Sequence, residues 1–293
     1  MKRLAIALSI LRHVLVVEII FPIRWQAFLF IRHFVKSPKY ISQPPSPPIV
    51  ISMTSYTQRF TFTRKSIKSL IMQNHSFSKI VLFLESRDFS SKATFDDLLK
   101  FNLEIREYKS NYRSYLKLIP ALELYTNDLI VTADDDMYYN KNWLKELMSC
   151  HDQYPMDICG HRGVVATKLN SSEYTPYQTW KAVDVAGCQT NLFLTSSAGI
   201  LYPPNIFDGT ILDMELAMKL SPTNDDIWVY FNALKCQISS RLVSSTNRDP
   251  YYWVGSQTSA LRHENVTEKL NDAIMNSMQK YFEQFLVIKE HYE

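Results

Sequence analysis

The sequence predicts an α/β fold in which a mostly parallel sheet is flanked by helices. From residue 49 to about residue 150, apolar runs rich in β-branched residues alternate with amphipathic helical stretches. This alternation is typical of parallel strands joined by right-handed helical crossovers. A chain of 293 residues that is 46% hydrophobic can build one large core with an appendage. Only six glycines occur and no glycine-rich phosphate loop is present, which argues against a dinucleotide oxidoreductase or a Walker-type ATPase.

Residues 1–41 form an apolar, basic segment that we expect to be helical and membrane-associated. Seven Lys or Arg and one acid give the first 40 residues a net charge of +6, so the remainder carries −3 of the total of +3. This asymmetry favours an anionic membrane surface over nucleic acid as a partner. A charged residue such as Arg12 or Glu18 at the centre of a spanning helix costs about 2.5–3.5 kcal/mol. We therefore expect a pair of helices around Pro22 that lie in the membrane surface; the alternative is that they dock on the rest of the chain.

The stretch 42–48 contains four prolines in seven residues and predicts a stiff linker at the one convincing domain boundary. The domain that follows, 49–293, divides into a regular strand–helix half (49–155), a half of shorter β pieces and loops (156–266) and a C-terminal helix (267–288) capped by Thr267. The predicted strands of the first half are 49–53, 79–84, 103–107 and 129–132, and its predicted helices are about 60–72, 93–100, 114–125 and 142–148. In the second half, β pieces at 157–162, 163–166 and 191–194 precede helices at about 211–219 and 225–236.

Three adjacent carboxylates, Asp134, Asp135 and Asp136, directly follow the apolar strand 129–132. A buried parallel strand delivers the residues after it to the carboxyl edge of the sheet, where open α/β folds bind ligands. Because neighbouring carboxylates repel one another, a divalent cation with hard oxygen ligands, Mg²⁺ or Mn²⁺, is expected to stabilise the cluster. On an extended chain Asp134 and Asp136 point to one side and Asp135 to the other. A solvated acidic loop without a ligand is the alternative.

This stretch resembles the metal site of GT-A glycosyltransferases, specifically bacterial family-2-like enzymes of surface polysaccharide and lipopolysaccharide synthesis. The resemblance covers roughly residues 49–240 and implies a Rossmann-like GT-A fold with Mn²⁺ or Mg²⁺ held by Asp134 and Asp136. It implies transfer of a sugar from a nucleoside-diphosphate donor to a glycan or lipid-linked glycan acceptor. In this scheme 49–155 binds the nucleotide and 156–266 binds the acceptor.

Five positions are candidates for holding the donor beside the metal: Thr54, Arg59, Glu85, Lys117 and Asp135, together with Asp134 itself. Thr54 and Glu85 end the first two strands, and the resemblance implies that an acid near Glu85 contacts the base or ribose. Arg59 and Lys117 lie where they can reach phosphates. The alternatives are ordinary: Thr54 as a helix cap, and the two basic residues on solvated helix surfaces.

Asp225 and Asp226 begin the predicted helix 225–236. The helix macrodipole favours carboxylates there whatever the function. The resemblance instead implies a catalytic pair in which Asp226 is the general base on the acceptor hydroxyl and Asp225 replaces the usual Glu. A base of this kind, with attack from behind the leaving group, implies inversion at the anomeric carbon.

Two other functions remain open for the same sequence. One is a nucleotidyl- or phosphotransferase that uses the same sheet edge and metal; the other is a catalytically inactive, membrane-tethered scaffold. The four cysteines show no metal-ligand spacing and indicate a reducing compartment. We expect the chain at the cytoplasmic face of the inner membrane, with a Golgi-type anchored enzyme as the alternative location.

Overall fold

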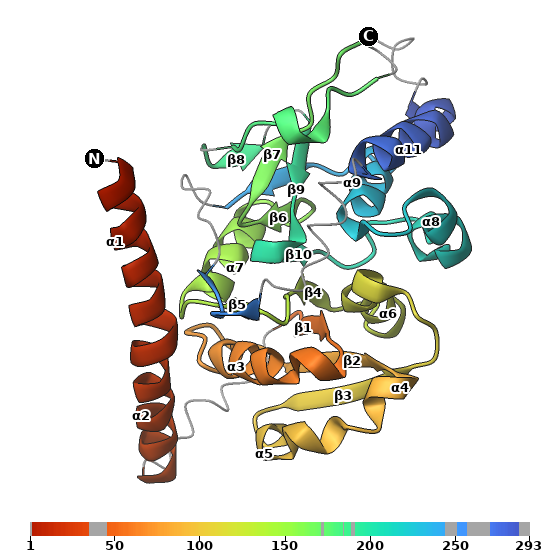
Figure 1. Cartoon of the computed structure of the whole chain (residues 1–293). Helices are drawn as coiled ribbons and strands as arrows, with labels where there is room; N and C mark the ends of the chain where they lie inside the picture. The colour runs from red at the N-terminus through yellow and green to blue at the C-terminus, as the bar shows by residue number, and fades with distance from the viewer. Residues whose placement is uncertain are drawn as a thin grey trace.

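An eight-stranded mixed sheet forms the centre of the molecule (Figure 1). The computed structural model describes residues 2–34, 46–170, 173–183, 185–188, 191–243, 251–256 and 270–286. The sheet has the order β3-β2-β1-β4-β10-β6-β11-β8. Its strands are β1 (Ile49–Thr54), β2 (Lys79–Glu85), β3 (Leu103–Tyr108), β4 (Leu129–Thr132), β6 (Ile158–Gly160), β8 (Gly187–Cys188), β10 (Ile200–Tyr202) and β11 (Ser240–Leu242).

The half of the sheet built from β3, β2, β1 and β4 is parallel, as the strand–helix alternation predicts. β10 lies antiparallel between β4 and β6, β11 is parallel to β6, and β8 closes the edge in the antiparallel direction. The predicted α/β fold with a mostly parallel sheet is therefore confirmed. Two short pairs lie outside this sheet: β5 (Met137–Tyr138) with β12 (Tyr251–Tyr252), and β7 (Gly163–Val165) with β9 (Leu192–Leu194). The sequence did not predict β8, β11 or β12, which are only two or three residues long.

Helices cover both faces of the sheet. They are α3 (Phe60–Ile71), α4 (Ser86–Phe89), α5 (Asp96–Leu99), α6 (Ile119–Leu124), α7 (Trp143–Gln153), α8 (Met214–Leu220), α9 (Asp225–Lys235) and α11 (Leu270–Leu286). The predicted helix 114–125 is wrong as one piece: a 3₁₀ segment, Arg113–Lys117, precedes α6. Pro120 lacks an N–H and its ring would clash with the carbonyl of Leu116, so it can stand only in the first turn of a helix. The predicted cap Thr267 lies outside the described residues.

The side chains of β1 alternate between two hydrophobic cores. Val50 packs into the core that also contains residues of α6, α9 and α11. Ile49, Ile51 and Met53 pack into the other core, with residues of α3, α5 and α7. Both faces of β1 are therefore covered by hydrophobic cores, and polar groups collect only at its carboxyl end.

Residues 2–34 form one long helix that stands beside α3 (Figure 1). It consists of α1 (Lys2–Val14), a π-helical turn (Leu15–Ile20) and α2 (Phe21–Phe34). The expected pair of separate helices is wrong. In the π turn the N–H of Phe21 bonds to the carbonyl of Val16, and this wider turn accommodates Pro22 without a break. Within the described residues, the stretch Leu8–Phe30 alone is long and apolar enough to cross a membrane.

Gly199, between a 3₁₀ turn (Ser196–Ala198) and β10, has a backbone that only glycine adopts easily. Its φ is 100°, and a Cβ there would lie 2.5 Å from the indole of Trp143. The same indole donates a hydrogen bond from Nε1 to the carbonyl of Ala198 at 2.7 Å. Trp143 thus fixes the loop that leads into β10.

We expect Gly199→Ala to lower the free energy of unfolding by about 2–4 kcal/mol, because the strained φ and the displaced indole both cost energy. Urea titration of the variant and the wild type measures the difference. Gly209→Ala is the control, since nothing lies within 4 Å of a Cβ at that position and its φ is not positive. Equal midpoints for Gly199→Ala and Gly209→Ala would contradict this account of Trp143.

Candidate active site

Most of the polar side chains that the sequence predicts for the site lie where β1 and β4 end. β1 pairs with β2 on one side and with β4 on the other, so the chain reverses its strand order between β1 and β4. In open α/β sheets the crevice at such a switch point is where ligands bind. Ser55, just after β1, donates a hydrogen bond from Oγ to Asp135 Oδ2 at 2.6 Å and connects the two strand ends.

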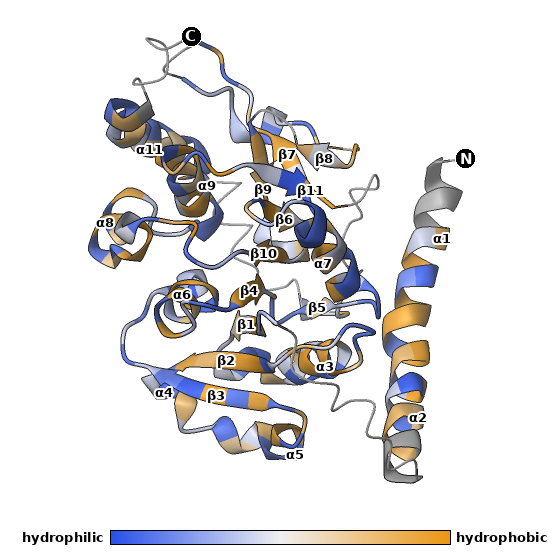
Figure 2. Cartoon of the chain, turned by 180° about the vertical axis from the view of Figure 1, so that it is seen from behind, coloured by the Kyte–Doolittle hydropathy of each residue, from blue (hydrophilic) through white to orange (hydrophobic). Residues whose placement is uncertain are grey.

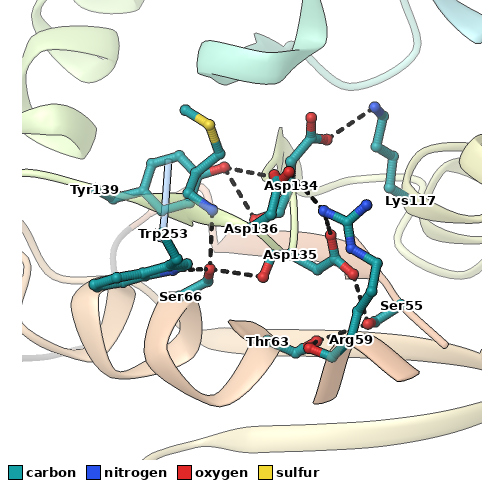
Figure 3. A network of polar contacts seen from close by, with 11 residues as sticks. Ser55, Arg59, Thr63, Ser66, Lys117, Asp134, Asp135, Asp136, Tyr139 and Trp253 are labelled. Atoms are coloured by element: carbon teal, nitrogen blue, oxygen red, sulfur yellow. Dashed lines mark hydrogen bonds and ion pairs between the residues drawn. The ribbon is translucent and has the colours of Figure 1, made fainter. Parts of the chain in front are cut away.

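Two cations of the chain bind the carboxylates of residues 134–136, here called the acidic loop (Figure 3). Arg59 Nη2 lies 3.1 Å from Asp135 Oδ1 and 2.5 Å from Asp136 Oδ2. Lys117 Nζ lies 3.0 Å from Asp134 Oδ1. The expectation that Asp134 and Asp136 share one side is wrong for these ion pairs, because the chain turns at Asp135 and Asp136 instead of remaining extended.

The backbone of the acidic loop is also held from behind. Ser66 Oγ, on α3, donates to the carbonyl of Asp135 at 2.8 Å and accepts from the N–H of Met137 at 3.1 Å. The same oxygen accepts from Trp253 Nε1 at 2.8 Å. Tyr139 accepts a hydrogen bond at its hydroxyl from the N–H of Asp134 at 2.6 Å. The one donor and two acceptor positions of the Ser66 hydroxyl are therefore all used.

Lys117 connects the acidic loop to the start of α9. Its ammonium contacts Asp134 Oδ1, Asp225 Oδ2 at 3.2 Å and Ser196 Oγ at 2.6 Å. These three partners match the three N–H donors of an ammonium group. Burial lowers the pKa of Lys117, but attraction by Asp134, Asp225 and Asp226 outweighs burial and holds the pKa well above its usual value. Lys117 is thus a permanent positive charge between the two acidic groups.

Asp225 and Asp226 occupy the first turn of α9, as predicted. Asn224 caps this helix by accepting from the N–H of Ile227 at 3.1 Å, and Asn271 of α11 accepts from Asn224 at 2.9 Å. Asp226 Oδ1 accepts from the N–H of Ser196 at 3.2 Å. Burial, with a smaller contribution from the adjacent Asp225, raises the pKa of Asp226 to about 7. Burial likewise raises the pKa of Asp135 to about 7, against the opposing attraction of Arg59.

The remaining two predicted donor residues lie at the neighbouring strand ends but make other contacts. Thr54 donates its hydroxyl hydrogen to the carbonyl of Phe83 at 2.9 Å, which ties β1 to β2. Glu85 lies at the carboxyl end of β2, 3.2 Å from Arg87 Nε, and burial raises its pKa. The structure therefore brings Arg59, Lys117 and all five aspartates together, while Thr54 is used in strand pairing and Glu85 remains at the rim of the same edge.

Four residues that position this cluster were not predicted from the sequence: Ser66, Tyr139, Ser196 and Trp253. Ser196 had a detectable signal, because the polar run 195–197 directly follows the predicted strand 191–194 as the acidic loop follows its own strand. Ser66 and Trp253 had none: a serine within an amphipathic helix and an isolated tryptophan are ordinary residues in any sequence.

The carboxylates of the acidic loop suit a metal ion whose coordination shell is completed by a bound phosphate ligand. Within the described residues no group of three His, Cys, Asp or Glu is arranged to enclose a metal ion. Mg²⁺ commonly binds one or two carboxylates and completes its shell with water and substrate phosphates. Asp134, whose side chain is 25% exposed, and Asp136 carry carboxylate oxygens of that kind, although their ion pairs bind them separately to Lys117 and Arg59. The chemistry of these residues fits a site that a phosphate ligand would complete.

No protein-family model matches the chain, and no curated protein matches it in sequence. Among solved structures, TarS 1-349 of S. aureus in complex with UDP-GlcNAc is similar with a TM-score of 0.51 and 16% identity, over 82% of this chain and 70% of that chain. The same protein in complex with UDP gives a TM-score of 0.45 and 18% identity, over 82% and 69%. The first likeness confirms the expected GT-A-like fold.

We expect Asp226→Asn to be more stable than the wild type at about pH 8, with a difference that shrinks towards about pH 5. In the unfolded chain the pKa of this carboxyl is near its ordinary value of 3.8, whereas in the folded chain it is about 7. The wild type therefore loses stability as the pH rises from about 4 to about 7, and keeps that loss above 7. Urea unfolding at both pH values measures this.

Glu283→Gln, at an exposed carboxylate of α11, is the control. A stability difference for Asp226→Asn that grows towards low pH would contradict the raised pKa.

Proposed function

We propose that this chain is a glycosyltransferase that moves a sugar from a nucleoside-diphosphate donor to a glycan acceptor with inversion at the anomeric carbon. The observation that carries this proposal is the single cluster in which Lys117 joins Asp134 of the acidic loop to Asp225 beside Asp226. Donor chemistry and acceptor chemistry need to meet within one such cluster. The UDP-GlcNAc bound in the similar TarS structure supports a nucleoside-diphosphate sugar as the donor.

The cluster carries more negative than positive charge, and a bound metal ion would offset the difference. Five aspartates face two cations, Arg59 and Lys117, so that a pyrophosphate would enter a site with excess negative charge. Asp134 and Asp136 would hold Mg²⁺ or Mn²⁺, which supplies Lewis-acid stabilisation of the leaving diphosphate. Arg59 and Lys117 position the acidic loop and offer their own positive charge to the phosphates.

Asp226 is the proposed general base. The acceptor oxygen forms a bond to the anomeric carbon, the bond from that carbon to the diphosphate oxygen breaks, and the acceptor proton moves to Asp226. A pKa of about 7 suits proton uptake at neutral pH. The N–H of Ser196 holds one oxygen of Asp226 in place, and Lys117 binds Asp225 beside it.

The acceptor is proposed to be a surface glycan linked to lipid, with the enzyme at the cytoplasmic face of the inner membrane. The support is the net charge of +6 in the first 40 residues and the apolar helix Leu8–Phe30. A lipid-linked acceptor diffuses in the same surface to which such a helix binds.

We expect UDP to raise the melting temperature of the chain, and to raise it further with Mn²⁺. Ligand at a hundredfold excess over its Kd stabilises the folded state by about 2.7 kcal/mol. Asp136→Asn should lose the Mn²⁺-dependent part, and the surface variant Asp152→Asn should keep it. No shift with any nucleoside diphosphate would favour an inactive scaffold, and a nucleotide-sugar product from sugar phosphate and nucleoside triphosphate would favour a nucleotidyltransferase.

We expect Asp226→Asn to lower kcat by about 10²–10⁴ because the acceptor proton loses its base. The Kd for UDP should stay within about a factor of three, since the residue acts on the acceptor side. The wild-type rate should fall as the pH drops below about 7, where Asp226 becomes protonated. NMR of the product gives the anomeric configuration; retention, or full activity of Asp226→Asn, would overturn the assigned role.

A further inference from the structure

The long N-terminal helix has two unlike faces. The inner face is buried against the catalytic domain through Val17, Phe21 and Trp25, which are 1%, 4% and 6% exposed. The outer face carries a row of exposed large hydrophobic side chains. They are Leu8, Leu11, Leu15, Ile19, Ile23 and Phe30, which recur at helical spacing and are each between 43% and 65% exposed. Much of the ribbon of this helix is orange, the colour of hydrophobic residues, in Figure 2.

Polar groups of the helix contact the catalytic domain. Glu18 pairs with Lys65 of α3 at 3.2 Å, and Arg24 donates to the hydroxyl of Tyr138 at 3.1 Å. His13 Nε2 lies 2.6 Å from the carbonyl of Tyr252 in β12. A helix that crossed the bilayer would break these contacts and carry Glu18 into the apolar region, which costs about 2.5–3.5 kcal/mol for a charge at the centre of the helix.

The inner face reaches the acidic loop through one tryptophan. Phe21 packs against Trp253 and Tyr138, with ring centroids 5.1 Å and 5.5 Å apart. Trp253 in turn donates from Nε1 to Ser66 Oγ, which donates to the carbonyl of Asp135. The N–H of Trp253 also donates to the carbonyl of Asp136 at 2.9 Å. The helix thus covers the residue that holds the acidic loop from behind.

We propose that α1 and α2 lie along the surface of an anionic phospholipid bilayer, with the outer face in the lipid, and that the docked inner face supports the donor site through Trp253. The coupling of the helix to nucleotide binding rests on the proposed function, whereas the orientation of the helix does not. The basic N-terminal segment complements anionic headgroups. Glu18, the one acid in the first 40 residues, contacts Lys65 instead of joining the apolar row.

The orientation is tested with the full chain on sealed vesicles of phosphatidylethanolamine and phosphatidylglycerol in equal parts. A peptide tag before Met1 should react with a membrane-impermeant reagent from the same side as the catalytic domain. Leu11→Glu/Ile23→Glu should reduce vesicle binding by at least about tenfold. A tag protected on the far side would mean a spanning helix and overturn the proposal. If the wild type formed dimers and did not bind vesicles, the proposal would also be overturned, because the outer face would then bind a second copy of the chain.

The coupling to the donor site is tested by UDP binding in the absence of lipid. Phe21→Ala should raise the Kd for UDP by roughly tenfold, because fewer molecules hold the acidic loop in its binding position. Ile23→Ala, on the outer face of the same helix, should leave that Kd unchanged. Phe21→Leu keeps a large apolar side chain and should therefore fold even if Phe21→Ala does not. Its Kd for UDP should lie between those of the wild type and Phe21→Ala.

An unchanged Kd in folded Phe21→Ala or Phe21→Leu would overturn the coupling. If the wild type bound no nucleotide at all, the proposed function and the coupling would fail, whereas the side on which the tag reacts would still decide how the helix lies.

Discussion

The ion pairs of Lys117 are the interaction on which the arrangement of this site depends. Asp134 follows β4 in the parallel half of the sheet, while Asp225 begins α9, about 90 residues later in the chain. A buried carboxylate without a partner costs several kcal/mol, so Asp225 alone would be expelled towards solvent or protonated. One ammonium between Asp134 and Asp225 stabilises both in the same place. The fold thereby brings the three aspartates of the acidic loop and the two of α9 into one cluster, as the proposed two-substrate reaction requires.

The parallel half of the fold and the acidic cluster were predictable because their signals are local. β1, β2 and β4 are mainly apolar runs of four to seven residues, β3 alternates apolar and charged residues, and the acidic loop follows β4 directly. Asp225 and Asp226 stand after a capping Asn224, which predicts the start of α9 whatever the function. The N-terminal helix was predicted as apolar and basic, but its continuity was not, since a π turn before Pro22 has no clear sequence pattern.

The remaining details depend on contacts between residues that lie far apart in the chain. The side on which each aspartate points was mispredicted because a turn at Asp135 and Asp136 replaces the extended chain. The sequence also did not indicate that Arg59 and Lys117 pair with the aspartates. No sequence pattern indicates that Trp253 bonds to Ser66, 187 residues away, or that a two-residue strand pairs there with β5. Such pairings are decided by packing and not by local propensity.

Two sets of contacts from distant parts of the chain hold the acidic loop in position. From the front, ion pairs with Arg59 and Lys117 hold its carboxylates, and a phosphate ligand competes for those same cations. From behind, Ser66, Tyr139 and Trp253 bond to backbone groups, which a ligand does not displace. When a donor enters, the contacts from behind are therefore the ones that keep the loop in position. Trp253 directly follows β12, a strand of two residues that is too short to be stable alone, so its position depends on the aromatic contacts of Phe21 and on the helix that carries Phe21.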